Sequence, residues 1–441
     1  MDLPNANRDG ACSGKGLVGE LELQARWFAG EFGRDFEGTS GERVRVVQFG
    51  IWNRTAGPDF VEAAVCINDG EVRRGAIELD PDVRDWERHG HSQNANYEEV
   101  VLHVFFTSGT VRVFSRTVSH RLVVQVQLGV QEKQGSLDGA VARAGRCAPV
   151  LGGMTAEEVR AVLQEAAHFR FQRKASALAR TGEAHGESEA LYQAVATGLG
   201  YPGNQLAFRL LAQRLSFARL AQQPEDAEAL LFGVAGFLPG PDLSALAPAA
   251  RHHARHLWAR WWTHRASHQA LVVPRAVWRM SGQRPANHPA RRVGALSVLV
   301  RHWRTVRRFV TGHEWERLSR VLGGMVHPFW SLHYTFGAAA ARSMALIGDE
   351  RVVELFINAV FPFTGAWESL LKLRAPERNR RSRIAAARLL AHRTDARALL
   401  KDAVNQQGLL QLYEDYCCRD ASDCVACPFP EQTKVRPHDV G

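Results

Sequence analysis

The spacing of apolar residues changes near residue 150, and this change restricts the chain to a fold with two kinds of architecture. Between residues 43 and 130, apolar and polar residues alternate, as in Arg43–Phe49, which is typical of strands with one buried face. Beyond residue 150, apolar residues recur every three or four positions, which indicates amphipathic helices. We therefore predict an α+β fold in which an α/β domain at residues 17–150 precedes a large all-α domain at residues 151–416.

Two tails flank these domains. Residues 1–16 are small, polar and rich in glycine, and we predict that they form a disordered tail. Residues 417–441 contain four closely spaced cysteines and form a cysteine-rich C-terminal tail.

The α/β domain begins with a helix predicted within Gly19–Phe32. The pair Asp69-Gly70 predicts a tight hairpin, and the polar stretch Asp82–Asn96 predicts a short helix with a loop. The predicted strands are residues 43–49, 60–67, 71–79, 100–106, 110–115 and 122–128.

The helical domain opens at a predicted capping box, in which Glu158 follows Thr155 by three residues. The first helix is predicted to continue to about Arg180. Further predicted helices cover residues 187–199, 204–221, 225–237, 250–269, 294–310, 314–323, 333–347, 350–360, 380–391 and 395–416.

The composition excludes several classes of protein. Hydrophobic residues make up 45% and charged residues 23% of the 441 residues, which excludes a wholly disordered chain, a collagen-like chain and a small disulfide scaffold. No stretch approaches the roughly 20 apolar residues of a membrane helix, so we expect no membrane partner. Residues 1–20 lack the apolar region of a signal peptide, and we expect a cytoplasmic protein.

Three carboxylates lie close together in the predicted strands. Asp59 begins one hairpin strand and Glu78 lies near the end of the next, so the two side chains are expected at the same end of the hairpin. Asp80 follows two residues later and offers a further ligand. Such carboxylates bind Mg or Mn, which can polarise a phosphodiester and activate water.

A histidine cluster follows this hairpin. Asp85 and His89 are four residues apart and share one face if the segment is helical. His91 comes just after Gly90, and His103 lies on a neighbouring predicted strand. Imidazoles with a carboxylate suit Zn or Mn. The alternative is that these histidines cap a turn or complete hydrogen bonds in the core.

Residues 243–313 form a basic segment with thirteen arginines and no aspartate or glutamate. So many arginines in a stretch without acidic residues lead us to expect nucleic acid as a partner, bound through phosphates, and the net charge of the whole chain is +9. The alternatives are a solvated face and pairing with acids elsewhere. The tryptophans of this segment are expected to be core anchors more than stacking platforms. The arginines predicted to bind nucleic acid are Arg279, Arg284, Arg291, Arg292, Arg304, Arg307 and Arg308.

Four terminal cysteines are a third candidate metal site. Cys417 and Cys418 precede Cys424 and Cys427, and the last two have the Cys-x-x-Cys spacing of zinc knuckles and iron–sulfur ligands. A four-thiolate site uses both Cys417 and Cys418, or one of them with the distant Cys147. We expect Zn or an iron–sulfur cluster here.

The order of helix, strands, Asp59 and Glu78 resembles the core of PD-(D/E)XK nucleases, which implies a restriction-endonuclease-like N-terminal domain. In that family a lysine follows the glutamate by two residues, where this chain has Asp80. The resemblance also implies an acidic residue on the first helix, Glu20 or Glu22, and a basic group from Arg74, His89 or His91. Some of these nucleases join their termini through one remote and three clustered cysteines.

Most of the chain also resembles an uncharacterised bacterial family, the domain of unknown function 2851. The resemblance lies in Gly50–Asn53, Gly57–Phe60, Ile77-Glu78, Asp85-Trp86, His89–His91, Tyr97, Leu102–Val104, Ala229–Phe237, Arg284–Pro289 and the terminal cysteines. It implies relatedness and no particular activity.

These observations predict a metal-dependent nuclease in which Asp59, Glu78 and Asp80 hold the metal and Arg74 or His89 steadies the phosphate or water. A first alternative is a non-catalytic nucleic-acid-binding or scaffold protein with a degenerate nuclease core, in which Asp59 and Glu78 pair with arginines. A second is a Zn or Mn hydrolase of small substrates centred on the histidines.

Overall fold

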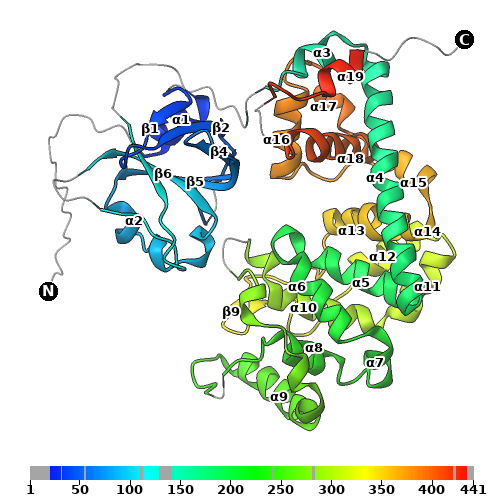
Figure 1. The fold of residues 1–441 in the computed structure, drawn as a ribbon. Helices are drawn as coiled ribbons and strands as arrows, with labels where there is room; N and C mark the ends of the chain where they lie inside the picture. The colour runs from blue at the N-terminus through cyan, green and yellow to red at the C-terminus, as the bar shows by residue number, and fades with distance from the viewer. Residues whose placement is uncertain are drawn as a thin grey trace, which may run out of the picture. The chain divides into compact units, whose positions relative to one another are not determined.

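The chain divides into two compact units (Figure 1). Unit 1 comprises Met1–Ala148 and Tyr416–Gly441, and unit 2 comprises Pro149–Asp415. The computed structural model describes residues 20–30, 32–53, 56–108, 113–128, 142, 144–240, 242–280, 284–420 and 424–434. The predicted tail at residues 1–16 lies outside them. A sheet in the N-terminal part and a helical remainder confirm the predicted mixed α/β class. The cysteine-containing C-terminal segment groups with unit 1.

Unit 1 is built on a seven-stranded sheet in the order β1-β2-β4-β5-β6-β7, with β3 paired to β4. Its strands are β1 (Asp35–Glu37), β2 (Arg43–Gln48), β3 (Ile51–Trp52), β4 (Phe60–Ile67), β5 (Val72–Asp82), β6 (Val100–Thr107) and β7 (Val124–Gln127). Pairs up to β4–β5 are antiparallel, whereas β6 runs parallel to both β5 and β7. Parallel neighbours need a crossover. The crossover from β5 to β6 contains α2 (Asp85–Arg88) and the 3₁₀ turns η1 (His91–Gln93) and η2 (Ala95–Tyr97).

The predicted hairpin between β4 and β5 is present. Asn68 and Asp69 have φ of 53° and 54°, and the Gly70 amide donates to the Ile67 carbonyl. Two consecutive left-handed residues are what a type I′ hairpin turn requires. The turn therefore centres on Asn68-Asp69, one residue earlier than the predicted pair.

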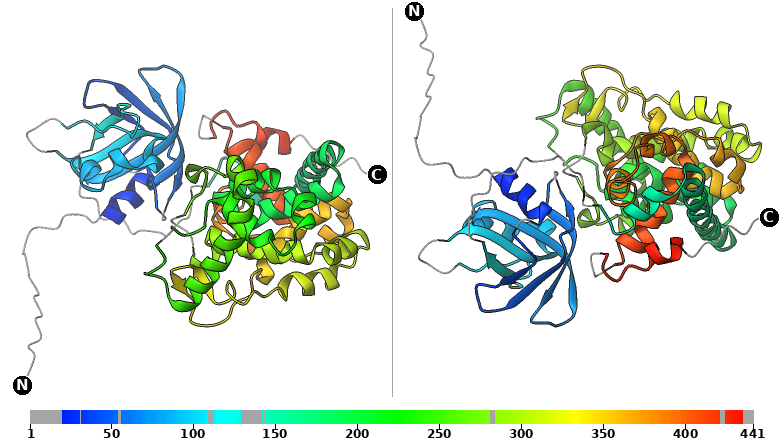
Figure 2. Two further views of the ribbon diagram at one scale, coloured as in Figure 1. Left: turned by 90° about the horizontal axis from the view of Figure 1, so that it is seen from below. Right: turned by 90° about the horizontal axis from the view of Figure 1, so that it is seen from above.

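Helix α1 (Glu20–Ala29), dark blue in Figure 2, contacts β5. Its aromatic side chains anchor it to the sheet. Trp27 is fully buried and stacks on Phe36, while Phe28 stacks on Phe60 at the start of β4. This packing sets α1 beside the end of the hairpin where Asp59 lies.

The strand predicted at residues 110–115 is not present in the part of it that the structure describes. Residues 109–112 lie outside the described residues, and residues 113–115 carry no strand. Arg116 and Leu122 form only an isolated antiparallel bridge, which leads into β7.

Unit 2 is largely helical. The Thr155 hydroxyl accepts from the Glu158 amide and the Glu158 carboxylate accepts from the Thr155 amide, so the predicted capping box is confirmed. The helix it opens extends to His185 instead of Arg180. The helices are α3 (Ala148–Gly153, at the boundary), α4 (Ala156–His185), α5 (Glu187–Leu199), α6 (Tyr201–Arg214), α7 (Phe217–Gln222), α8 (Ala227–Ala235), α9 (Pro248–His268), α10 (Pro289–Arg301), α11 (Trp303–Thr311), α12 (Trp315–Gly323), α13 (Asp349–Leu355), α14 (Phe361–Thr364), α15 (Trp367–Leu371), α16 (Arg380–Leu389), α17 (Ala396–Leu399) and α18 (Ala403–Leu412).

Shorter elements join these helices. They are the 3₁₀ turns η3 (Gln269–Leu271), η4 (Arg275–Val277) and η5 (Pro285–Asn287), and the π-helices η6 (Phe356–Val360) and η7 (Tyr413–Cys417). Helix α19 (Phe429–Lys434) ends the described part of unit 1.

The prediction of a helix at residues 333–347 is wrong. This segment contains a small hairpin of β8 (His333–Thr335) and β9 (Ala338–Ala339). The buried Arg291 guanidinium donates to the carbonyls of Trp330, Met344 and Ala345 on both sides of the hairpin. The buried arginine thus fixes the chain on both sides of the hairpin by satisfying carbonyls that have no water to bond to.

The tryptophans of the basic segment are mostly core residues. Trp261, Trp278 and Trp303 are buried in the core of unit 2, as predicted, whereas Trp262 is 61% exposed. Among the described residues, no helix combines the length and the apolar character needed to cross a membrane.

We predict that Gly408→Ala destabilises unit 2 by about 3 kcal/mol, because over-packing a tight core costs this much. Gly408 of α18 lies against the Leu163 carbonyl of α4, and an added methyl group would overlap that oxygen. The control is Gly153→Ala, since no atom lies within 4 Å of the added methyl group there. Urea unfolding of both variants measures the difference, and equal midpoints would contradict the close packing of the two helices.

Candidate functional site

The predicted pair of carboxylates meets at one end of the β4–β5 hairpin. Phe60 pairs with Ile77, so Asp59 and Glu78 are the next residues along the two strands. The Asp59 amide donates to Glu78 Oε2 at 2.9 Å, and the Leu79 amide donates to Asp59 Oδ2 at 3.1 Å. Each carboxylate is thus held by the backbone of the opposite strand.

Helix α1 also contributes to this pair, through a residue that the sequence analysis missed. Gln24 Nε2 donates to Asp59 Oδ1 at 2.8 Å, and Gln24 Oε1 accepts from Trp52 Nε1 at 3.1 Å. The sequence feature that could have identified Gln24 is its position, as a polar residue, one helical turn before the apolar pair Trp27-Phe28. The side chains of Glu20 and Glu22, which the nuclease resemblance suggested for this helix, lie outside the described residues.

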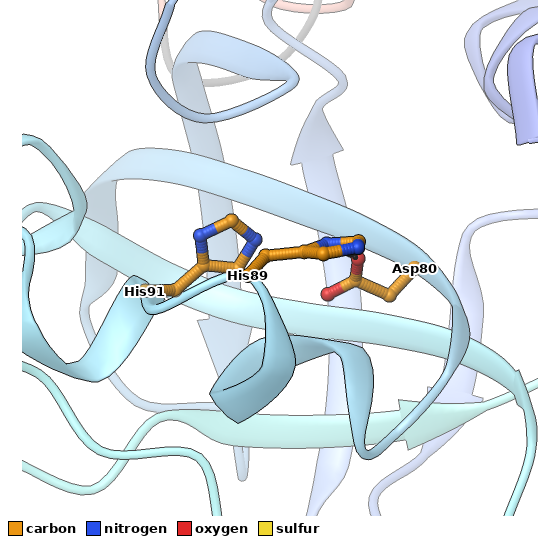
Figure 3. Close-up of side chains that lie close together, drawn as sticks. All are labelled: Asp80, His89 and His91. Atoms are coloured by element: carbon orange, nitrogen blue, oxygen red, sulfur yellow. Dashed lines mark ion pairs between the residues drawn. The ribbon is translucent and has the colours of Figure 1, made fainter.

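Three histidines surround the next carboxylate on β5. His89 Nδ1 lies 3.4 Å from Asp80 Oδ1, and His103 Nε2 lies 3.2 Å from Asp80 Oδ2. His91 Nε2 lies 3.1 Å from Glu78 Oε1. Figure 3 shows the His89 ring between the His91 ring and the Asp80 carboxylate. The carboxylate pair and the histidine cluster, predicted as separate candidates, therefore form one site.

The local backbone explains how the histidines converge. Parallel pairing sets His103 of β6 opposite Glu78 of β5. After the single turn of α2, Gly90 has φ of 73°, a left-handed conformation that ends a helix readily in glycine. The reversal at Gly90 returns both His89 and His91 toward β5.

Two aromatic residues support the imidazoles. Tyr97 stacks on His91 with ring centroids 3.9 Å apart. Trp86, fully buried, contacts both His91 and His103, and its Nε1 donates to the Arg116 carbonyl. These contacts fix the ring planes.

The site concentrates negative charge in a buried place. Asp80 is 1% exposed and Glu78 is also buried, whereas the His89 side chain is 44% exposed and faces solvent. Two buried carboxylates on one strand are unfavourable unless cations or protons offset them. Asp80 Oδ2 and His103 Nε2 are both buried, and neither makes a hydrogen bond to a described residue despite their 3.2 Å separation. A cation held between these two atoms would satisfy both of them.

The far side of His103 is held by a polar contact. His103 Nδ1 lies 2.6 Å from Ser115 Oγ, which accepts from Gln125 Nε2 at 2.9 Å. This contact fixes the orientation of the His103 ring beside Asp80. The ligand atoms of Asp80, His89 and His91 all lie within 4.8 Å of one another, which is compatible with one ion. Mixed imidazole and carboxylate donors favour Mn or Zn over Mg.

Arg74 does not belong to this site, which corrects its predicted catalytic role. It precedes Glu78 by four residues on β5, or about 13 Å of extended strand. Its guanidinium donates to the carbonyls of Cys418 and Arg419 at 3.0 and 2.7 Å. The Asp85 carboxylate is also directed away from the site, since it accepts from the Asp82 amide and pairs with Arg88.

The cysteines predicted as ligands all belong to unit 1. Cys147, Cys417, Cys424 and Cys427 are buried, whereas Cys418 is half-buried.

The arginines of the basic segment divide into two groups. Arg279, Arg284, Arg304, Arg307 and Arg308 are exposed. Arg291 is only 1% exposed and donates to carbonyls, and Arg292 donates to the Leu346 carbonyl and the Tyr201 hydroxyl. Burial lowers the pKa of Arg292 to about 10. These two side chains hold unit 2 together, so we correct their predicted contact with nucleic acid.

A second group of potential ligands, which the sequence analysis missed, lies in unit 2. It consists of Glu228, His253 and His327. Glu228 is buried and accepts from His253 Nε2 at 2.9 Å, His327 Nε2 at 3.1 Å and Trp330 Nε1 at 2.7 Å. Burial raises the pKa of Glu228, but the hydrogen bonds from both histidines outweigh burial and hold it well below its ordinary value.

The protonation of His327 marks this second group as structural. Its Nδ1 accepts from the backbone amides of Phe329 and Trp330, both at 3.1 Å. A neutral ring with Nδ1 as acceptor carries its proton on Nε2. That nitrogen donates to Glu228 and cannot also bind a metal.

The sequence matches the family described as "Protein of unknown function (DUF2851)" over residues 20–380, and the chain belongs to this family. The family resemblance seen in the sequence is thereby confirmed. No curated protein and no solved structure matches the chain.

We predict that Glu228→Gln destabilises unit 2 by about 2–4 kcal/mol, since it removes a buried charge that three donors surround. The matched control is Glu225→Gln, which changes an exposed residue nearby and should cost less than about 0.5 kcal/mol. Urea unfolding measures both. A loss of bound metal without a loss of stability would instead identify a metal site.

The stabilisation of unit 2 by the Glu228 carboxylate should depend on pH. Because the folded-state pKa of Glu228 lies below its ordinary value of 4.5, the stabilisation is complete above that value and declines as pH falls. The stability difference between wild type and Glu228→Gln should therefore be largest near neutral pH and shrink below about pH 4.5. Unfolding curves between pH 3 and 7 test the trend, and a constant difference would contradict it.

Proposed function

We propose that this member of the DUF2851 family is a metal-dependent nuclease that hydrolyses phosphodiester bonds. The observation that carries the proposal is the convergence of Glu78 and Asp80 with three histidines beside Asp59 in unit 1. Carboxylate and imidazole ligands in one buried cluster are suited to holding a divalent cation at a reaction centre.

The topology of unit 1 supports this proposal. Helix α1 precedes the antiparallel strands β2, β4 and β5, and α2 then leads to the parallel strand β6. This order is similar to the core of PD-(D/E)XK nucleases. Asp59 directly precedes β4 and lies opposite Glu78 of β5.

Asp80 replaces the lysine of that pattern, and the histidines account for the replacement. A lysine beside Glu78 supplies positive charge and orients water in such a site. Here His89 and His103 flank Asp80, so the acidic residue becomes a metal ligand instead. The ligand set therefore contains more nitrogen atoms than a set of carboxylates would, so we propose Mn rather than Mg as the bound metal.

Each residue of the site has its own role in the proposed reaction. Asp80, His89 and His91 would hold the metal, which polarises a phosphodiester and activates a water molecule. Glu78 is held at Oε2 by the Asp59 amide, and its Oε1 lies at the His91 edge, where it can accept a proton from water. His89 lies on the solvent side, from which substrate would enter.

Exposed arginines support nucleic acid as the substrate class. Arg304, Arg307 and Arg308 project from α11 to solvent, in a segment without any acidic residue between Asp242 and Glu314. Such groups bind phosphates without regard to sequence.

We predict that wild type cleaves single- or double-stranded DNA or RNA with Mn, and that Asp80→Asn and Glu78→Gln each reduce the rate about 100-fold or more. Both substitutions keep side-chain size and remove a negative charge. The control is Asp69→Asn, at the tip of the β4–β5 turn. Cleavage rates and Mn affinity by calorimetry are measured on the same samples.

Each result distinguishes the proposal from its alternatives. Nucleic-acid binding without Mn-dependent cleavage would favour a non-catalytic binding or scaffold protein with a degenerate core. Hydrolysis of small esters without nucleic-acid binding would favour the Zn or Mn hydrolase. Cleavage that survives both substitutions would contradict the assigned site.

A further prediction concerns the arginines of α11. Replacing Arg304, Arg307 and Arg308 with alanine should make the slope of log affinity against log salt shallower by about 2–3, because up to three phosphate contacts are lost. The charge-matched control replaces the exposed Arg180, Arg209 and Arg219. Fluorescence anisotropy with labelled oligonucleotides gives the slopes, and equal slopes for the two triple variants would contradict a role for α11.

A further inference from the structure

Helix α9 lies beside α8 in unit 2 and has an inner face that is both apolar and charge-compensated (Figure 1). On this face the buried Trp261 packs against Gly233 of α8. Arg260 and His264, also on the inner side, both pair with Asp226 just before α8. The contacts that hold α9 in unit 2 therefore come from one side of the helix.

The outer face of α9 is basic. Arg255, Trp262 and Arg265 are exposed on it, together with His252 and His256. The helix contains no aspartate or glutamate. In the described part of the chain, the ion pairs of α9 all belong to its inner face, so the positive charge of the outer face remains available to an anionic partner.

Trp262 is an unusual residue for such a face. It is 61% exposed, whereas Trp258, one turn earlier, is half-buried and its Nε1 donates to the Pro239 carbonyl at 2.9 Å. Ala259 and Ala266, one turn away on either side, carry only methyl groups and leave the indole uncovered. Removing an aromatic ring from water is favourable, so a partner that covers this ring would gain binding free energy.

A cation lies over the ring of Trp262. The Arg265 guanidinium carbon lies 4.8 Å from the ring centroid, and Arg265 Nε donates to Gln269 Oε1 at 2.9 Å. Trp258 meets the same ring only at an angle, with centroids 6.3 Å apart and planes inclined by 56°. An exposed ring beside a held guanidinium suits a nucleotide, because its base can stack on the ring while a phosphate binds the arginine.

We propose that the outer face of α9 binds single-stranded nucleic acid, with one base stacked on Trp262 and the adjoining phosphates bound by Arg255 and Arg265. The proposal rests on the proposed function in taking nucleic acid as the partner, and it adds the preference for single strands. In a duplex the bases already stack on one another inside the helix, so only a single strand can offer a base to an exposed indole.

An anionic membrane surface is the alternative partner for a helix with arginine and tryptophan. Helices that lie in a membrane insert a broad apolar face into it. The apolar face of α9, with Leu257 and Trp261, is instead buried in the core of unit 2. The structure therefore favours nucleic acid.

Binding measured without cleavage tests the role of Trp262. Fluorescence anisotropy of the full-length protein in EDTA compares a labelled oligothymidine with a duplex of the same length. Trp262→Ala should weaken single-strand binding about tenfold, as expected for one lost base stack, and duplex binding less than about twofold. Trp262→Phe should restore most of the affinity, because phenylalanine also stacks. The control Phe169→Ala, which removes an exposed aromatic residue of α4, should change neither affinity.

The two arginines are tested by the salt dependence of single-strand binding. Replacing Arg255 and Arg265 with alanine should make the slope of log affinity against log salt shallower by about 1.4, because two phosphate contacts are lost. An unchanged slope would contradict their assignment to phosphates.

The remaining outcomes separate this surface from the nuclease proposal. Equal single-strand affinities for wild type and Trp262→Ala would overturn the surface, as would an equal loss with the duplex. Binding of wild type to phosphatidylserine vesicles but to no oligonucleotide would overturn it in favour of a membrane. Binding that depends on Trp262 without Mn-dependent cleavage would support the surface and contradict the nuclease. Cleavage by wild type with unaltered binding in Trp262→Ala would do the reverse.

Discussion

The burial of Glu78 and Asp80 on one face of β5 is the constraint on which the rest of unit 1 depends. Two carboxylates removed from water require compensation, and the surrounding elements supply it. The parallel strand β6 brings His103, and the crossover before it brings His89 and His91. Three features place these imidazoles beside the strand: the position of α2, the reversal at Gly90 and the packing of Trp86.

The protein contains two clusters of glutamate or aspartate with histidine, and hydrogen bonding separates their roles. Around Glu228, two backbone amides donate to Nδ1 of His327, and the carboxylate accepts from His253, His327 and Trp330. Around Asp80, the buried oxygen and the His103 nitrogen face each other without a hydrogen bond. The first arrangement is complete without a ligand, whereas the second is suited to one.

Much of the site could be predicted because hairpin geometry is local. The spacing from Asp59 to Glu78 across a short turn was enough to bring them together. Contacts between distant segments were not accessible in this way. Gln24, Ser115 and Gln125 are ordinary polar residues in sequence, and only packing brings them to Asp59 and His103. Arg291 looked like a basic surface group until burial showed it bound to carbonyls.

The sequence by itself determined the division into sheet and helices, the capping box at Thr155 and the hairpin with its two carboxylates, because each depends on residues close in the chain. Only the tertiary structure decided that the carboxylates and histidines lie together and that Arg74 contacts the C-terminal segment. It also distinguished Cys417, which is buried, from Cys418, which is half-buried. Strand order and burial settle these points, and both arise from contacts between residues far apart in sequence.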